Sequence, residues 1–125
     1  MWSDTWVGLP YRLGGRGPEY DCMGLWLALR RLRFGDEVPD SNCDQREALR
    51  GRAFATMRPS FADVETAVEG DLILFRHSRR CLHVGYALGA KDMLHTSSAI
   101  GHSLIERFDS VKWRPSIVGI YRYGA

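Results

Sequence analysis

The stretch YDCMGL, residues 20–25, joins a glycine-rich loop to the first helical pattern of the chain. After Asp21, apolar side chains recur every three or four residues, which is the spacing of one face of an α-helix. Gly35 closes this pattern and suits the left-handed residue that commonly follows a helix. Residues 8–18, before the pattern, are rich in glycine and proline and predict turns. We therefore expect a helix that begins at or next to Cys22.

The rest of the chain predicts a second helix and then a run of strands. We expect the second helix from about Asp44 to Met57, because Pro59 follows and cannot continue it. Five short segments with strand character lie at residues 71–76, 82–88, 93–96, 104–107 and 117–122. Helices followed by strands indicate an α+β fold. No repeat or linker divides the chain, so we expect a single domain over residues 1–125.

Length and composition set broad limits on the function. The 125 residues suffice for one domain, and 45% hydrophobic and 26% charged residues are average for a soluble globular protein. The formal net charge of +2 is too small to indicate a nucleic-acid partner. The apolar runs are too short to cross a bilayer, and the first residues do not resemble a signal peptide. We therefore expect synthesis in the cytoplasm, no nucleic-acid binding and no membrane insertion.

Cys22 is the first candidate for chemistry. A cysteine in the first turn of a helix lies near unpaired backbone N–H groups and the positive end of the helix dipole, which favour the nucleophilic thiolate. Asp21 is a candidate cap of this helix, and Gly24 permits close approach of another segment. The alternative is that Cys22 has no chemical role and is a small buried apolar residue. Three cysteines are an odd number, so at least one is expected to remain outside any disulfide.

A base for Cys22 can come from the histidines on the predicted strands. In residues 82–88 the alternation places His83 on one face with small residues, and we expect this face to let a helix pack close to the imidazole. His95 follows twelve residues later, and an odd-length hairpin loop would bring both imidazoles to the same face. His95 can then orient His83, as in catalytic triads, the alternative being a buried structural histidine.

Two other kinds of site fit the sequence less well. A metal site would need ligands scattered along the chain, namely Cys22, Cys81, His83 and His95. No pair among them has the spacing of a zinc knuckle, so we expect no metal. Residues 14–17 are not followed by the Lys-Ser/Thr pair of a phosphate-binding loop. The arginine-rich segments 29–33 and 77–80 are expected to form solvated surfaces, the alternative being contact with an anionic polymer or a partner protein.

Three blocks of the sequence together resemble the NlpC/P60 family of papain-like cysteine peptidases. Residues 10–15 (PYRLGG) with 20–25 (YDCMGL) are similar to the family's Tyr-x-x-Gly-Gly loop and its Asp-Cys-Ser-Gly nucleophile motif. Residues 70–75 (GDLILF) are similar to the Gly-Asp-Leu strand before the catalytic histidine. Residues 83–89 and 93–95 resemble the family's histidine strand and the strand that follows it. The resemblance covers nearly the whole chain, with the blocks in the family's order.

The resemblance implies a papain-like fold, with N-terminal helices packed on a five- to six-stranded antiparallel sheet. It implies a thiol protease in which Cys22 is the nucleophile, His83 the general base and His95 the orienting group, without metal or cofactor. The backbone N–H of Cys22 and the hydroxyl of Tyr11 would hold the oxyanion. The residues expected to form the substrate-binding and oxyanion region are Tyr11, Asp21 and Met23.

The resemblance also implies a substrate and a place of action. The usual substrate is peptidoglycan, cut between γ-D-glutamate and a diamino acid of the stem peptide. Met23 and Leu13 depart from the family pattern, so the pocket walls are expected to differ. With no leader expected, an aromatic-rich N-terminus and the run GGRGPEYDC at residues 14–22, the chain looks most like peptidases of phage tails and gene transfer agents. This implies tail hub or tip proteins as partners and action in the periplasm or cell wall. The alternatives are a structural tail-tip protein with an occluded or vestigial site, and an amidase or acyltransferase of the same superfamily.

Overall fold

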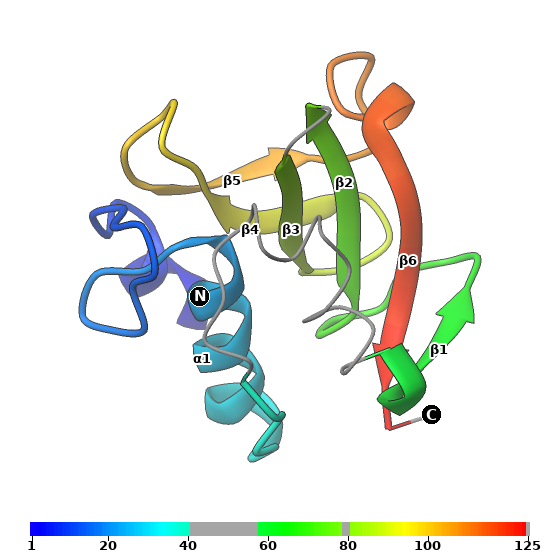
Figure 1. Ribbon diagram of the computed structural model, residues 1–125, viewed down its shortest axis with the longest axis horizontal. Coiled ribbons are helices and arrows are strands. Elements are labelled where there is room, and N and C mark those ends of the chain that lie inside the picture. Colours follow the sequence, from blue (N-terminus) through cyan, green and yellow to red (C-terminus); the bar gives the residue numbers. More distant parts are fainter. Residues whose placement is uncertain (41–57, 79–80, 125) are drawn as a thin grey trace.

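The computed structural model describes residues 1–40, 58–78 and 81–124, which form a helix beside a six-stranded sheet (Figure 1). In chain order the elements are η1 (Trp2–Trp6), α1 (Cys22–Phe34), η2 (Arg58–Ser60), β1 (Phe61–Val64), β2 (Leu72–Ser78), β3 (Cys81–Ala87), β4 (Asp92–Thr96), β5 (Ser103–Arg107), η3 (Arg114–Ser116) and β6 (Ile117–Tyr123). The second expected helix, residues 44–57, lies outside the described residues. No helix in the described ranges is long and apolar enough to span a membrane.

The strands form one antiparallel sheet in the order β1-β6-β2-β3-β4-β5. The last strand, β6, runs between β1 and β2 (red in Figure 1). All five strands expected from the sequence are present, so the α+β class and the antiparallel sheet are confirmed. The sequence patterns miss β1, whose four residues are too few for alternation to stand out and which is defined by its pairing with β6.

Helix α1 begins at Cys22, as the sequence predicts. Oδ1 of Asp21 accepts a hydrogen bond from the N–H of Gly24 at 2.7 Å, which satisfies one donor of the first turn. Gly24 is needed because a Cβ at this position would overlap the carbonyl oxygen of Gly15. Gly35 ends the helix with φ of 71°, a conformation that glycine adopts without strain. These local features hold Cys22 at the first position of the helix.

Two clusters of buried apolar side chains cover opposite faces of the sheet. The first packs α1 on the sheet and includes Leu25, Trp26, Leu29, Leu74, Val84, Tyr86 and Leu94. The second includes Ile73, Phe75, Ala87, Met93, Phe108 and Trp113. Neighbours in sequence such as Met93 and Leu94 belong to different clusters, because successive side chains of a strand point to opposite faces. The sheet is therefore covered by α1 on one side and by side chains of strands and loops on the other.

The face of β3 that carries His83 is not the face that α1 covers. The helix packs on the side of Val84, whereas Ala87 belongs to the second cluster. A Cβ on Gly85 would come within 2.6 Å of Sδ of Met93, so the glycine makes room for a methionine side chain. The expectation that this small-residue face lets a helix pack close to His83 is therefore wrong, because side chains from neighbouring strands fill the space.

Candidate active site

Cys22 is buried at the start of α1, with 3% of its surface exposed. The neighbouring cap carboxylate is held from outside the helix by Arg16, whose Nη1 donates to Oδ1 of Asp21 at 2.8 Å. Nε of the same guanidinium donates to Oδ2 of Asp40 at 2.7 Å. Arg16 thus ties the glycine-rich loop to the cap of α1 and to the segment that follows the helix, a role that no sequence pattern indicated. The thiol is fixed at the positive end of the helix dipole, which favours its thiolate form.

Asp21 and Met23, two of the residues expected to form the substrate-binding region, flank Cys22 at the start of α1, and Tyr11, the third, pairs with Tyr20 just before it. Tyr11 is half-buried, and its backbone N–H donates to the carbonyl oxygen of Gly101 at 3.0 Å. Met23 is partly buried and packs against the cluster under α1. Asp21 is 1% exposed, and its carboxylate is engaged in capping the helix. The contact of these residues with a substrate stays a prediction.

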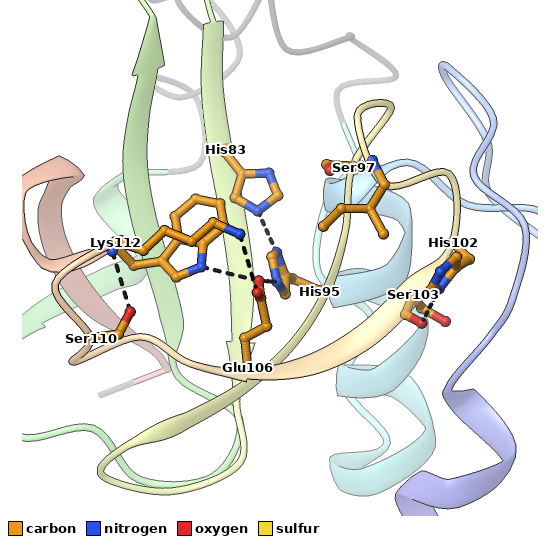
Figure 2. Close-up of polar contacts among 10 residues, drawn as sticks. His83, His95, Ser97, His102, Ser103, Glu106, Ser110 and Lys112 are labelled. Carbon is orange, nitrogen blue, oxygen red and sulfur yellow. Dashed lines mark hydrogen bonds and ion pairs between the residues drawn. The ribbon is translucent and has the colours of Figure 1, made fainter.

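His83 on β3 and His95 on β4 are hydrogen-bonded to each other (Figure 2). Nε2 of His83 lies 2.8 Å from Nδ1 of His95, and each residue is 1% exposed. The antiparallel register, with Tyr86 opposite Leu94, puts both histidines on one face, as the hairpin length predicts. One imidazole is therefore in position to orient the other, which is the relation between a general base and its partner in a triad.

A carboxylate that the sequence analysis missed continues this row of polar groups. Oε2 of Glu106 on β5 lies 2.7 Å from Nε2 of His95 (Figure 2). Nε1 of Trp113 donates to the same oxygen at 3.0 Å, and Nζ of Lys112 donates to Oε1 at 3.3 Å. The pairing of Met93 with Glu106 puts the carboxylate on the face of the histidines. The sequence does not indicate the register of β5 against β4, so Glu106 could not be identified from it.

Aromatic rings enclose the two imidazoles. The Trp113 ring stacks on His83 with centroids 5.5 Å apart and planes inclined by 18°. The same indole makes an edge contact with His95, with ring centroids 5.2 Å apart and planes inclined by 89°. The ring centroids of Phe75 and His83 are 5.7 Å apart. A stacked indole attracts a positively charged ring, so this wall favours His83 when it carries a second proton.

Burial and the Glu106 carboxylate shift the pKa of His95 in opposite directions. Burial lowers the pKa of His95 below its ordinary value, although the hydrogen bond with Glu106 acts to raise it. For Glu106, burial disfavours the charged form, but hydrogen bonds from His95, Lys112 and Trp113 outweigh it and hold the pKa below its ordinary value. At neutral pH, His95 is therefore a neutral imidazole beside an ionised carboxylate.

The helix that carries Cys22 lies next to the histidine strands. α1 contacts both β3 and β4, and Figure 1 shows its N-terminal end beside β4. The register pairs of β3 with β4 are Tyr86 with Leu94 and Ala87 with Met93, and His83 lies beyond them toward the start of β3. The approach of Cys22 to His83 stays a prediction. Among the described residues, no group of three or more His, Cys, Asp or Glu side chains is arranged to hold a metal ion.

The fold and this arrangement correspond to a known class of proteins. Residues 8–122 match the NlpC/P60 family. The chain therefore belongs to the NlpC/P60 family, and the resemblance carried by the three sequence blocks is confirmed. Its fold is the NlpC/P60 fold, with α1 beside the antiparallel sheet.

Known relatives agree with this assignment. The chain is 31% identical over 110 residues to the murein DD-endopeptidase MepS/murein LD-carboxypeptidase of Escherichia coli (strain K12). The match covers 87% of this chain and 53% of the relative, so the chain spans about half the length of that protein. An NlpC/P60 family protein from Bacillus cereus ATCC 10987 has a TM-score of 0.69 at 23% identity, covering 98% of this chain and 38% of that one. The NlpC/p60 domain of the peptidoglycan hydrolase SagA has a TM-score of 0.57 at 20% identity, covering 94% and 88%. These structural likenesses show the fold.

Proposed function

We propose that the protein is a cysteine peptidase that hydrolyses peptidoglycan stem peptides. The observation that supports this most is the 2.8 Å hydrogen bond between His83 and His95, on strands next to the helix that begins with Cys22. A nucleophile at a helix start, a buried base and a partner for that base are the groups that acyl transfer by a thiol requires. Cys22 is the proposed nucleophile, His83 the general base and His95 the orienting group.

The proposed reaction passes through a thioester. His83 takes the proton of the Cys22 thiol as the sulfur attacks the carbonyl carbon of the substrate, and the carbonyl oxygen becomes an oxyanion. The Cys22 N–H and the Tyr11 hydroxyl are the proposed donors to this oxyanion. The amide bond then breaks, and the proton passes from His83 to the leaving amine. Water, deprotonated by His83, hydrolyses the thioester and releases the carboxylate product and the thiol.

The substrate class follows from the family and from the relatives. MepS is named a murein endopeptidase and carboxypeptidase, and SagA a peptidoglycan hydrolase. We assign the same polymer to this chain, with the bond between γ-D-glutamate and the diamino acid as the proposed point of cleavage. Met23 and Leu13 depart from the family pattern, and their side chains are the proposed source of any narrower choice among stem peptides.

Delivery to the cell wall by a phage tail or gene-transfer-agent particle is the finer part of the proposal. It rests on the resemblance of residues 14–22 to such peptidases, and tail hub or tip proteins are the proposed partners. Detection of the protein in purified particles by mass spectrometry tests it. An amidase or acyltransferase would use the same Cys22 and His83, and a structural tail protein would use neither.

Product analysis separates these functions. Purified peptidoglycan and defined stem peptides are incubated with the wild-type protein, with Cys22→Ala and with Cys22→Ser, and the products are identified by mass spectrometry. We expect new carboxyl and amino termini from the wild type and no cleavage by either variant. Circular dichroism of the variants provides the control for folding. Cleavage by Cys22→Ala at the wild-type rate would exclude the thiol mechanism, and transfer of the acyl group to an added amine would indicate an acyltransferase.

A further inference from the structure

We propose that Glu106 is a positioning residue that sets the protonated nitrogens of both buried histidines, so that Nδ1 of His83 is the basic atom of the site. This inference rests on the proposed function for its consequence in catalysis. It extends the row of groups by one member beyond Cys22, His83 and His95, and it assigns to β5 a part in the chemistry. Figure 2 shows the row running from His83 through His95 to Glu106.

Glu106 fixes the position of the proton that it shares with His95. An ionised carboxylate only accepts hydrogen bonds, and the indole N–H of Trp113 only donates. Oε2 of Glu106 accepts from Nε1 of Trp113 at 3.0 Å and lies 2.7 Å from Nε2 of His95. The hydrogen bonds from His95, Lys112 and Trp113 keep the carboxylate ionised. Nε2 of His95 must therefore carry the proton that it shares with Glu106.

The proton on Nε2 of His95 in turn constrains His83. A neutral imidazole has one N–H and one lone pair, so His95 with a proton on Nε2 presents a lone pair at Nδ1. Nδ1 of His95 lies 2.8 Å from Nε2 of His83, and both rings are buried. Nε2 of His83 must then be the donor, because two lone pairs facing each other at this distance would repel. Neutral His83 is left with its lone pair on Nδ1, the nitrogen on the side away from His95.

The row of groups also affects the charged state of the proposed base, His83. When His83 accepts a proton at Nδ1, it becomes an imidazolium whose Nε2–H still donates to His95. The negative charge of Glu106 at the end of the row stabilises this cation through His95, and the stacked Trp113 ring stabilises it directly. Among the described residues, Lys112 is the other charged group bonded to Glu106, and its side chain is 62% exposed, so water screens its opposing effect. The net influence of the row is to favour the thiolate–imidazolium pair over the neutral pair.

Two substitutions of Glu106 separate its functions. Glu106→Gln keeps an oxygen that can accept from His95 and Trp113 but removes the charge. Glu106→Ala removes both the acceptor and the charge. Asp109→Asn is the matched control, because Asp109 is a nearby carboxylate that forms an ion pair with Arg107 and is not bonded to the histidines. The same charge is lost in the control, away from the row.

The measurements are chosen so that they report on the imidazoles as well as on turnover. Cleavage of a defined stem peptide gives kcat and KM. Alkylation of Cys22 by iodoacetamide, at about pH 7 and again at about pH 9, needs no peptide substrate and reports the thiolate. Nitrogen-15 NMR of the imidazoles reads which ring nitrogen carries the proton. Thermal unfolding of each variant shows any loss of stability.

The Glu106 variants are expected to differ from the Asp109 control in kcat, in alkylation of Cys22 and in the tautomers of the histidines. Glu106→Ala lowers kcat by about 10- to 100-fold, as expected for a partner that acts through another group, and leaves KM near the wild-type value. Glu106→Gln lowers kcat by a smaller factor. Both variants slow alkylation at neutral pH more than at alkaline pH, where the thiol ionises without help from His83. The NMR spectrum shows Nε2–H in both histidines of the wild type and a mixture of tautomers in Glu106→Ala, whereas Asp109→Asn resembles the wild type throughout.

Two results would overturn the inference. One is an Nδ1–H tautomer for both histidines in the wild type, since this would make Glu106 irrelevant to the position of the proton. The other is a pair of Glu106 variants that match Asp109→Asn in the ratio of alkylation rates at the two pH values and in kcat. Failure of the proposed function would give a different outcome, namely no peptidoglycan cleavage by the wild type while the alkylation ratio and the tautomers still respond to Glu106.

Discussion

Asp71, directly before β2, and Glu106, on β5, are two carboxylates that are each held by several donors. The Asp71 side chain is 1% exposed and accepts from Nε and Nη2 of Arg122 at 3.0 and 2.9 Å, and from the N–H of Val68 at 2.9 Å. The Glu106 side chain is 23% exposed and accepts from an imidazole, an indole and an ammonium group. The two differ in their partners more than in the number of bonds.

The difference in partners determines what each carboxylate can do. An arginine side chain stays protonated at every pH that the protein survives, so the pair of Asp71 and Arg122 has one state and acts as a clamp between the start of β2 and β6. His95 can lose, gain or relocate a proton, so the pair of His95 and Glu106 has several states. We infer that Asp71 serves the stability of the fold and that Glu106 serves the protonation of the site.

The strongest test of this contrast removes the base at the end of the histidine row. His83→Ala is expected to lower kcat by roughly 1,000-fold, equivalent to about 4 kcal/mol, because proton transfer to and from the sulfur is lost. His95→Ala is expected to cost less, about 10- to 100-fold, because it acts through His83. Steady-state kinetics on a stem peptide measures both. A larger loss in His95→Ala than in His83→Ala would mean that their roles are exchanged.

The clamp is tested by Asp71→Ala. We expect a loss of about 2–3 kcal/mol in the free energy of unfolding, because Arg122 loses a bidentate partner and the N–H of Val68 loses its acceptor. The loss stays below that of a fully buried ion pair, since the Arg122 side chain is 34% exposed and water can reach it. Urea denaturation measures the change. The kcat of the folded fraction should equal that of the wild type, and a fall in kcat as large as that of Glu106→Ala would erase the distinction between the two carboxylates.

The clamp and the histidine row also differ in how far the sequence could predict them. The start of α1 was predictable because its cap Asp21, its apolar spacing and its final Gly35 are local features. The contact of His83 with His95 was predictable because the length of one hairpin determines which face each residue occupies. Predictions of this kind need only residues that are close together in the sequence.

The remaining parts of the candidate site depend on contacts between distant or irregular segments. Glu106 reaches His95 only through the register of β4 with β5, and the Trp113 ring reaches His83 only because the loop before η3 folds over the sheet. The position of Arg16 between Asp21 and Asp40 also depends on the path of an irregular loop. The prediction that a helix packs on the His83 face of the sheet was wrong. The alternation of side chains separates the two faces of a strand but does not indicate which face a helix will cover.

A smaller effect, on the free energy of unfolding, is expected when the pH is lowered. The pKa of Glu106 in the folded protein lies below its ordinary value of 4.5, so its contribution to stability is complete above that value and is lost as the pH falls through the lower folded value. Glu106→Gln should therefore lose less stability than the wild type between neutral pH and acid, by a few tenths of a kcal/mol for a partly exposed group. Urea denaturation at several pH values measures this. Glu69→Gln is the control, since Arg33 likewise lowers the pKa of Glu69 with no contact to the histidines, and it should leave kcat unchanged.

The smallest effect is expected at the exposed end of the row. Lys112→Met removes the ammonium group that lies 3.3 Å from Oε1 of Glu106, while His95 and Trp113 remain bonded to Oε2. Because the lysine side chain is 62% exposed, we expect less than about a twofold change in kcat and less than about 0.5 kcal/mol in stability. Stem-peptide kinetics at low and high salt measures the change. A loss of kcat comparable to that of Glu106→Ala would mean that the ion pair, and not the hydrogen bond to His95, holds the carboxylate in its working position.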